Sequence, residues 1–140
     1  MEIIKFKFNK QSNDKGSLVF LEGCKDIPFE VKRLYYIYGI ENGIRRGFHA
    51  HKELNQALIC IHGSCKIMLD DGTEKSAIVL NDPSEGLFVG KLVWREMYDF
   101  SDDAVLLVLA SSYYDEQDYI RDYNDFISYL ETSKNEYTLS

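Results

Sequence analysis

The segment Arg45–His51 holds the residues of this 140-residue chain that are best suited to proton transfer. It reads Arg-Arg-Gly-Phe-His-Ala-His, and His49 and His51 are two of the three histidines in the sequence. Side chains alternate between the two faces of a β-strand, so both imidazoles are predicted to point the same way. Imidazole exchanges a proton near neutral pH, and the guanidinium of Arg46 can bind an anion through paired donors. The segment therefore predicts a site for an anionic ligand that undergoes acid–base chemistry.

Gly47 affects where Arg46 points. Strict alternation places Arg46 with Phe48 and Ala50 on the face that packs, whereas a glycine lets the strand depart from this pattern and lets a ligand approach the backbone. The alternative is a purely structural role for the histidines. That reading is weaker for a His-x-His pair beside Arg and Gly than for a single histidine.

The overall composition predicts one globular domain with no nucleic-acid or membrane partner. The chain is 45% hydrophobic and carries a net charge of -7, which disfavours binding to nucleic acids and anionic membranes. We find no apolar run long enough to cross a bilayer and no signal-peptide pattern. The three cysteines, Cys24, Cys60 and Cys65, form no paired motif, so free thiols in the reducing cytoplasm are expected.

Short β-strands separated by turns account for most of the chain. The expected strands are residues 3–8, 17–21, 31–38, 45–51, 55–61, 65–69, 76–80, 87–89, 93–100 and 104–110. Residues 9–16 are expected to be a polar turn, and Asp70-Asp71-Gly72 is a strong hairpin signal. Many short strands at this spacing indicate an all-β jelly roll or barrel.

Near the C-terminus the period changes to that of an amphipathic helix. Apolar residues at helical spacing predict about four turns at about residues 115–131. Asp115, Glu116 and Asp118 would then lie in the first turn, where the helix dipole favours anions. We expect this helix to pack outside the barrel or against a second subunit. The single domain would span residues 1–132, followed by a polar tail at 133–140.

The histidine segment resembles the first motif of the cupin family. The positions that match its spacing are Gly43, His49, His51, Gln56 and Gly63. In metal-binding cupins the two histidines and a glutamate at the position of Gln56 are ligands, and a further histidine comes from a second motif. Here Arg95 stands in the place of that last histidine, and a permanently cationic arginine cannot ligate a metal. The resemblance therefore implies a cupin barrel, a double-stranded β-helix, without its metal.

A wider set of motifs resembles the small bacterial sugar 3,4-ketoisomerases, which act on dTDP-4-keto-6-deoxy-D-glucose. The motifs are residues 46–52, 63–65, 69–72, Val89-Gly90 with Trp94 and Glu96-Met97, and residues 112–116. The histidine segment also resembles the dTDP-sugar 3,5-epimerases. The resemblance implies a cytoplasmic homodimer that binds a dTDP-linked 4-keto-6-deoxy sugar and uses neither a metal nor a cofactor. It also implies a 3-keto product that feeds an aminotransferase, giving a 3-amino-3,6-dideoxyhexose for a surface glycan.

The residues suit this reaction on chemical grounds. A base removes the acidified hydrogen at C-3 of the 4-keto sugar, and reprotonation of the resulting enediol at C-4 leaves the ketone at C-3. The resemblance to the epimerase segment, where the matching histidine is the base, implies that His49 is the base, and His51 on the same face is the expected proton relay or second acid. Alternation lets only one of Tyr35 and Tyr36 face the pocket, and we choose Tyr35 as the phenol that binds or protonates the oxyanion. The expected substrate-binding residues are Arg33 and Arg46 for the pyrophosphate, together with Lys15, Gln56 and Arg95.

Several alternatives stay open at this point. The chain can instead be a dTDP-sugar epimerase, a metal-dependent cupin enzyme, or a cupin that binds a sugar without converting it. The configuration at C-4 of the product, gluco or galacto, is not fixed by the sequence. Glu96 and Asp99 either orient a histidine or are solvated, and Trp94 lies in the core or in a pocket wall.

Overall fold

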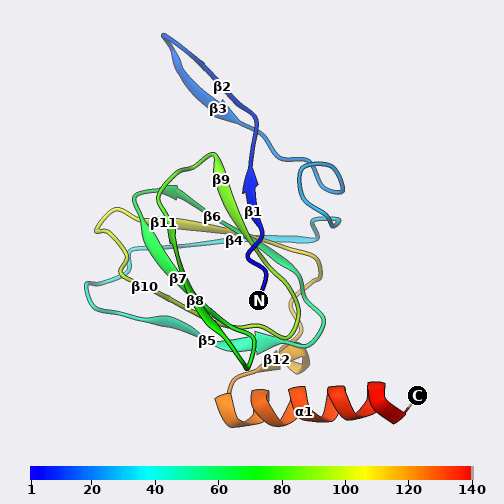
Figure 1. The fold of residues 1–140 in the computed structure, drawn as a ribbon. Coiled ribbons are helices and arrows are strands. Elements are labelled where there is room, and N and C mark those ends of the chain that lie inside the picture. Colours follow the sequence, from blue (N-terminus) through cyan, green and yellow to red (C-terminus); the bar gives the residue numbers. More distant parts are fainter. Residues whose placement is uncertain (140) are drawn as a thin grey trace.

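The computed structural model describes the backbone of residues 1–139 and the side chains of residues 1–134. Two five-stranded antiparallel sheets face each other and enclose the apolar core (Figure 1). A two-stranded hairpin projects from the barrel, and one helix lies on the opposite side of the molecule. This is the all-β jelly roll with a terminal helix that the strand spacing predicts.

The first sheet contains the strand that carries Tyr35. Its order is β1 (Lys5–Lys7), β9 (Glu85–Val89), β6 (Gln56–His62), β11 (Val105–Ala110) and β4 (Arg33–Tyr38). β6 is buried along Gln56–Cys60, as expected for an apolar strand covered on both faces. β4 is an edge strand whose burial alternates, with residues 33, 35 and 37 turned inward and residues 34, 36 and 38 exposed.

The second sheet contains the histidine strand. Its order is β12 (Tyr119–Ile120), β5 (Arg46–His51), β10 (Trp94–Tyr98), β7 (Cys65–Asp70) and β8 (Lys75–Leu80). The predicted hairpin at Asp70-Asp71-Gly72 joins β7 to β8. Buried side chains from both sheets, such as Leu58 and Leu106 against Ile67 and Met97, form one apolar cluster between them. This cluster fills the barrel beside the histidines and fixes the spacing of the two sheets.

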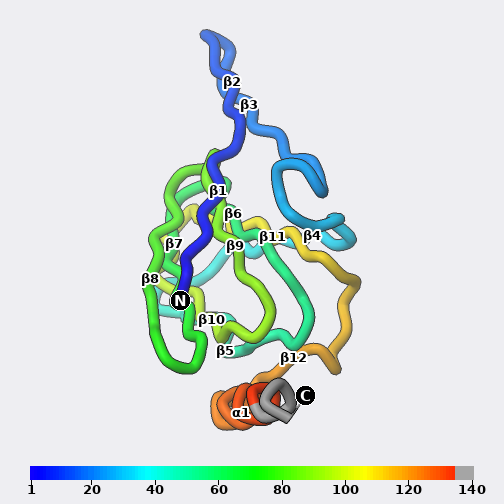
Figure 2. Tube along the Cα trace, turned by 45° about the vertical axis from the view of Figure 1, so that its right-hand side comes forward, coloured from blue at the N-terminus to red at the C-terminus, as the bar shows by residue number. Residues whose placement is uncertain are grey.

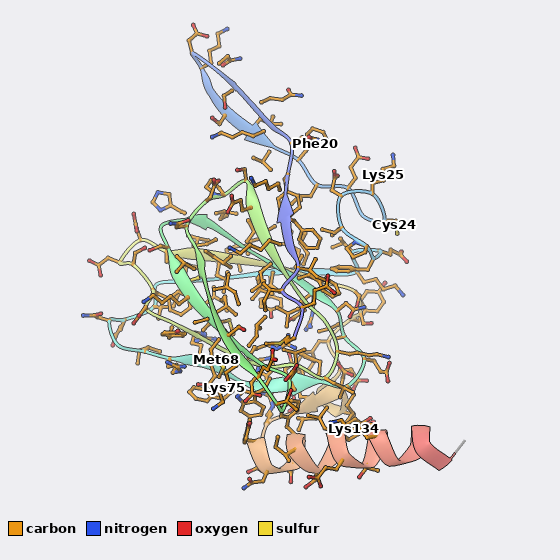
Figure 3. The ribbon with its side chains drawn as sticks, viewed as in Figure 1. Phe20, Cys24, Lys25, Met68, Lys75 and Lys134 are labelled. Atoms are coloured by element: carbon orange, nitrogen blue, oxygen red, sulfur yellow. The ribbon has the colours of Figure 1, made fainter. Side chains whose placement is uncertain are left out.

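The hairpin outside the barrel is formed by β2 (Lys10–Asn13) and β3 (Gly16–Val19). The prediction of a polar turn over residues 9–16 is therefore wrong for 10–13, which pair with β3; only the residues between the two strands form the turn. Figure 2 shows the hairpin standing away from the barrel. Phe20 lies at its base, and the loop that carries Cys24 and Lys25 leads on toward β4 (Figure 3).

The helix α1 (Tyr123–Leu139) covers the outer surface of the second sheet. Phe126 is buried against Trp94, and their ring centroids are 5.9 Å apart. Met68 packs on the same cluster, and the ammonium group of Lys75 lies 6.0 Å from the ring of Tyr123. Met68 and Lys75 mark this surface in Figure 3. No helix in the described part of the chain has the length and apolar character needed to cross a membrane.

The helix begins later than the sequence predicts. Asp115 caps only the short 3₁₀ helix η1 (Glu116–Asp118), where its carboxylate accepts from the Gln117 amide. β12 then pairs with β5, so Tyr119 and Ile120 belong to the sheet although their spacing suits a helix. The helix starts after Asp122, whose carboxylate accepts from the Asp125 amide as an N-cap does. It also continues through most of the predicted polar tail, to Leu139.

Candidate active site

A cavity of about 380 Å³ opens between the two sheets beside the histidine strand. Its size is that of a small-molecule site. The polar side chains in its wall are Arg33, Tyr35, Arg46, His49, Tyr119 and Arg121. They come from β4, from β5 and from the segment that follows η1, so the cavity depends on the late start of the helix.

A bulge in β5 decides which side chains of the histidine strand reach this cavity. Arg95 of β10 pairs with His49, but the next residue, Glu96, pairs with Gly47, so Phe48 is the extra residue. Gly47 and Phe48 have φ values of 93° and 59°. Arg46 consequently lines the cavity, and Phe48, which strict alternation would bury, is 43% exposed. A Cβ on Gly47 would lie 2.7 Å from the carbonyl oxygen of Arg95, so the close approach of β5 and β10 requires glycine.

His49 is the imidazole in the cavity wall. Burial, assisted by the nearby Arg95 guanidinium, lowers its pKa to about 4. The ring is therefore neutral at pH 7 and has a free lone pair, which a general base requires. His49 and His51 do share a face, as alternation predicts, and their rings meet edge to face with centroids 5.0 Å apart.

His51 lies behind His49 rather than in the cavity wall. It is 1% exposed, and its Nδ1 is 2.9 Å from Oδ2 of Asp118. Burial and the Arg95 charge lower its pKa below the ordinary value. Its other nitrogen, Nε2, is buried and has no hydrogen-bond partner among the described residues. Sequence patterns did not indicate Asp118 as its partner, since helical spacing placed that residue in the first turn of a helix.

Tyr35 is one end of a buried chain of hydrogen bonds that leads to Arg95. Its phenol accepts a 3.2 Å bond from the Gln56 amide nitrogen, and the Gln56 amide oxygen accepts a 2.5 Å bond from Arg95. Arg95 also donates to the Val93 carbonyl at 2.9 Å. Burial raises the pKa of Tyr35, so the phenol keeps its proton at neutral pH. Gln56 and Arg95 are each 1% exposed and do not line the cavity. They influence it through Tyr35 and His49, which do.

Three guanidinium groups line the cavity of this acidic protein. Arg33 stacks between the rings of Tyr35 and Tyr114, at 5.4 and 5.6 Å. Arg46 comes from the bulged end of β5. Arg121, which the sequence did not suggest, lies 4.1 Å from the Tyr119 ring centroid and forms two hydrogen bonds with Glu116. Arg45, by contrast, is held away from the cavity by Glu96, at 2.7 Å.

Other candidates from the sequence lie away from the cavity wall. The hairpin β2–β3 projects from the barrel (Figure 1). Lys15 is in its turn and does not line the cavity of its own chain. Glu96 accepts from Arg45 and from the Trp94 indole, and Asp99 pairs with Lys66, so neither carboxylate orients a histidine. Trp94 belongs to the core under the helix.

The residues present do not fit the metal site of a cupin. His49 and His51 supply two imidazoles, but the neutral amide oxygen of Gln56 is already engaged by the cation Arg95. A guanidinium at this place repels a divalent ion and offers it no lone pair. In the described residues there is no cluster of three or more histidine, cysteine, aspartate or glutamate side chains suited to a metal.

The family model of FdtA, described as WxcM-like, C-terminal, matches residues 1–131. This chain belongs to the FdtA family. A relative, the TDP-4-oxo-6-deoxy-alpha-D-glucose-3,4-oxoisomerase of Aneurinibacillus thermoaerophilus, is 52% identical over 130 residues. The match covers 93% of this chain and 94% of that protein. The predicted resemblance to the sugar 3,4-ketoisomerases is thus confirmed.

Solved structures support the same relationship. The 3,4-ketoisomerase QdtA from Thermoanaerobacterium thermosaccharolyticum, in complex with TDP, is 50% identical with a TM-score of 0.91. That match covers 94% of this chain and 96% of the other. A variant of QdtA has been solved with TDP-4-keto-6-deoxyglucose, also at 50% identity and a TM-score of 0.91, over 93% and 94% of the two chains. The sugar epimerase NovW from Streptomyces spheroides shares only the fold, at 15% identity and a TM-score of 0.72, over 84% and 67%.

Proposed function

We propose that this protein is a sugar-nucleotide 3,4-ketoisomerase that converts a TDP-linked 4-keto-6-deoxyglucose into the 3-keto-6-deoxyhexose. The observation that carries this proposal is the pairing of a neutral imidazole, His49, and a protonated phenol, Tyr35, in the wall of one cavity. The relatives that are about half identical over nearly the whole chain carry the same activity in their names.

The reaction moves hydrogen between neighbouring carbons and needs no change in overall oxidation state. His49 takes the C-3 proton, and the electron pair of that C–H bond becomes the double bond of an enediol. Tyr35 donates a hydrogen bond to the oxygen at C-4 as its negative charge develops. His49 then returns a proton to C-4. The proton that leaves the O-3 hydroxyl as the C-3 ketone forms is transferred to the oxygen at C-4, which becomes a hydroxyl. Each proton taken up is returned, so residues alone can complete the cycle.

The guanidinium groups suit the diphosphate of the substrate. Arg33 and Arg46 line the cavity and carry no carboxylate partner among the described ion pairs, whereas Arg121 is neutralised by Glu116. A planar guanidinium can hold phosphate oxygens through two parallel hydrogen bonds. We therefore assign the diphosphate to Arg33 and Arg46, with the sugar deeper in the cavity near His49.

We also propose that two copies associate as a homodimer. β4 is the edge of its sheet, yet its outward residues are Leu34, Tyr36 and Tyr38, which are 54, 58 and 69% exposed. No third strand joins the hairpin β2–β3 within residues 1–139, and isolated two-stranded hairpins are marginally stable in water. A second copy would cover both surfaces. Light scattering after size-exclusion chromatography tests this point, because a monomer at micromolar concentration would contradict it.

The competing activity is epimerisation, which would leave the ketone at C-4 and invert a neighbouring carbon. Either activity acts on a nucleotide-activated sugar, and we assign the protein to the cytoplasm on that ground. A product with its ketone at C-3 suits an aminotransferase as the next enzyme. The test is incubation of the purified protein with TDP-4-keto-6-deoxyglucose, followed by ¹³C NMR. A carbonyl carbon at position 3 supports ketoisomerisation. A carbonyl that stays at position 4, with altered stereochemistry or with no change, contradicts it.

A further inference from the structure

We propose that Asp118 is a positioning residue that holds His51 in the tautomer protonated on Nδ1, so that Nε2 of His51 is a proton acceptor beside His49. This inference rests on the proposed ketoisomerase function and assigns a residue to it. Asp118 lies in η1, a segment that contacts β5 only because the chain is extended through β12.

The geometry fixes the proton on one nitrogen of His51. A carboxylate can only accept, so a 2.9 Å contact between Nδ1 of His51 and Oδ2 of Asp118 requires the proton on Nδ1. Since the ring is neutral, Nε2 then carries a lone pair. That nitrogen is buried and has no hydrogen-bond partner in the described part of the chain, so no group of the protein uses its lone pair.

Asp118 is itself held so that its two oxygens cannot exchange roles. Oδ1 accepts a 2.8 Å hydrogen bond from the Glu53 amide, and the Asp118 carbonyl accepts another from the Lys52 amide, at 3.0 Å. These contacts tie η1 to the residues directly after the histidine strand. The orientation of the His51 ring is therefore set from outside the cavity, through one carboxylate.

The chemistry of ketone transfer calls for a second acceptor of this kind. When the ketone moves to C-3, the O-3 hydroxyl loses its proton, while His49 is occupied with the proton that moves from C-3 to C-4. The Nε2 lone pair of His51 lies next to His49, with ring centroids 5.0 Å apart. Arg95 is a permanent donor, and Tyr35 already donates to the oxygen at C-4, so neither takes that proton. His51 in the Nδ1-protonated form supplies this acceptor on Nε2. It passes the proton on to the oxygen at C-4, so the ring is neutral again once the C-4 hydroxyl has formed.

The substitution Asp118→Asn tests this tautomer directly. The Glu53 amide must donate to an oxygen, so the asparagine oxygen faces Glu53 and its NH₂ group faces Nδ1 of His51. Nδ1 must then accept, and the proton moves to Nε2. The matched control is Asp115→Asn, in the cap of the same 3₁₀ helix: it removes the same charge, and its amide oxygen can still accept from Gln117.

Two readouts separate the inference from the proposed function. ¹⁵N NMR of the histidine side chains is expected to show the proton of His51 on Nδ1 in the native protein and on Nε2 in Asp118→Asn. With TDP-4-keto-6-deoxyglucose, kcat is expected to fall at least about 100-fold in Asp118→Asn with little change in KM, because a wrong tautomer disables proton transfer. Asp115→Asn is expected to retain both the native tautomer and native kcat.

A native protein with the proton on Nε2 of His51 would overturn the inference, whatever the variants do. So would an Asp118→Asn variant that changes the tautomer and keeps its kcat, or one that loses kcat with the tautomer unchanged. If the native protein shows the expected tautomer but no turnover, the proposed function fails while the placement of Asp118 stands.

Discussion

Arg95 lies directly opposite His49 in the ladder between β10 and β5, so a permanent cation and an imidazole share one pair of positions. Burial and this guanidinium together keep His49 neutral. In metal-binding cupins a fourth ligand stands at the position of Arg95. Here the Arg95 guanidinium donates a hydrogen bond to Gln56, and Gln56 donates one to Tyr35. One buried cation therefore affects both the charge of the base and the position of the phenol.

The pH dependence of catalysis is expected to reflect the lowered pKa of His49. Since the base must be unprotonated, kcat/KM should fall as the pH decreases through about 4, the pKa of His49 in the free protein. The negative diphosphate of a bound substrate favours the imidazolium, so the acid limb of kcat should lie at a higher pH than that of kcat/KM. Both profiles come from steady-state rates; an acid limb of kcat/KM at pH 6.5 or above would contradict the assignment.

The same experiment needs a check on folding. The unfolded chain takes up protons on its histidines below about pH 6.5, whereas folded His49 and His51 resist protonation. Because the unfolded state then binds more protons, the folded state loses stability as the pH falls below that value. Circular dichroism at each pH distinguishes loss of the base from loss of the fold.

Replacement of the base should abolish turnover without unfolding the protein. His49→Asn keeps a polar side chain of similar size but offers no basic nitrogen, so kcat should fall by about 10²–10⁴. The control is His62→Asn, since the His62 side chain is 65% exposed at the far end of β6 and lies outside the cavity. Binding of TDP, measured by calorimetry, should be unchanged in both variants. Full activity in His49→Asn would remove it from the mechanism.

Two neighbouring tyrosines on β4 allow a test of the phenol. Tyr35 faces the cavity and Tyr36 faces outward, at 58% exposure. Tyr35→Phe deletes only the hydroxyl that stabilises the developing oxyanion, and kcat should fall about 10²–10³-fold. Tyr36→Phe should behave as the native protein does. Equal rates for the two variants would show that Tyr35 serves packing alone.

Two neighbouring arginines, one in the cavity and one outside it, allow a test of which guanidinium binds the diphosphate. Arg46→Ala removes a guanidinium from the cavity, so KM for the nucleotide sugar should rise about tenfold, with a weaker dependence on salt. Arg45→Ala removes a partly exposed ion pair with Glu96 and should leave KM unchanged. Steady-state kinetics at two ionic strengths checks this. A larger effect on KM from Arg45→Ala would place the diphosphate elsewhere.

Local patterns in the sequence predicted those parts of the site that depend on strand geometry alone. Alternation placed His49 and His51 on one face and allowed only one of Tyr35 and Tyr36 to face the cavity; Tyr35, the one we chose, does so. The hairpin at Asp70-Asp71-Gly72 follows from turn chemistry in the same way. These features need no knowledge of which strands pair.

The contacts that the sequence did not predict depend on pairing between distant segments. Asp118 reaches His51 across 67 positions because Tyr119 and Ile120 add a strand to the edge of β5, which their helical spacing does not indicate. Arg95 was expected to touch the substrate, but the register of β10 with β5 buries it behind His49. The bulge at Phe48 that brings Arg46 to the cavity likewise exists only in the paired sheet.

The measurement that tests the central claim most directly is isomerisation of TDP-4-keto-6-deoxyglucose in deuterated water, followed by ¹H and ¹³C NMR. We predict a product with its ketone at C-3 and deuterium at C-4, because a solvent-exchanged His49 returns the proton to that carbon. Deuterium at C-3 or C-5 of a sugar whose ketone stays at C-4 would show an epimerase. A sugar that is bound, but neither exchanged nor converted, would show a binding protein; both results would contradict the ketoisomerase assignment.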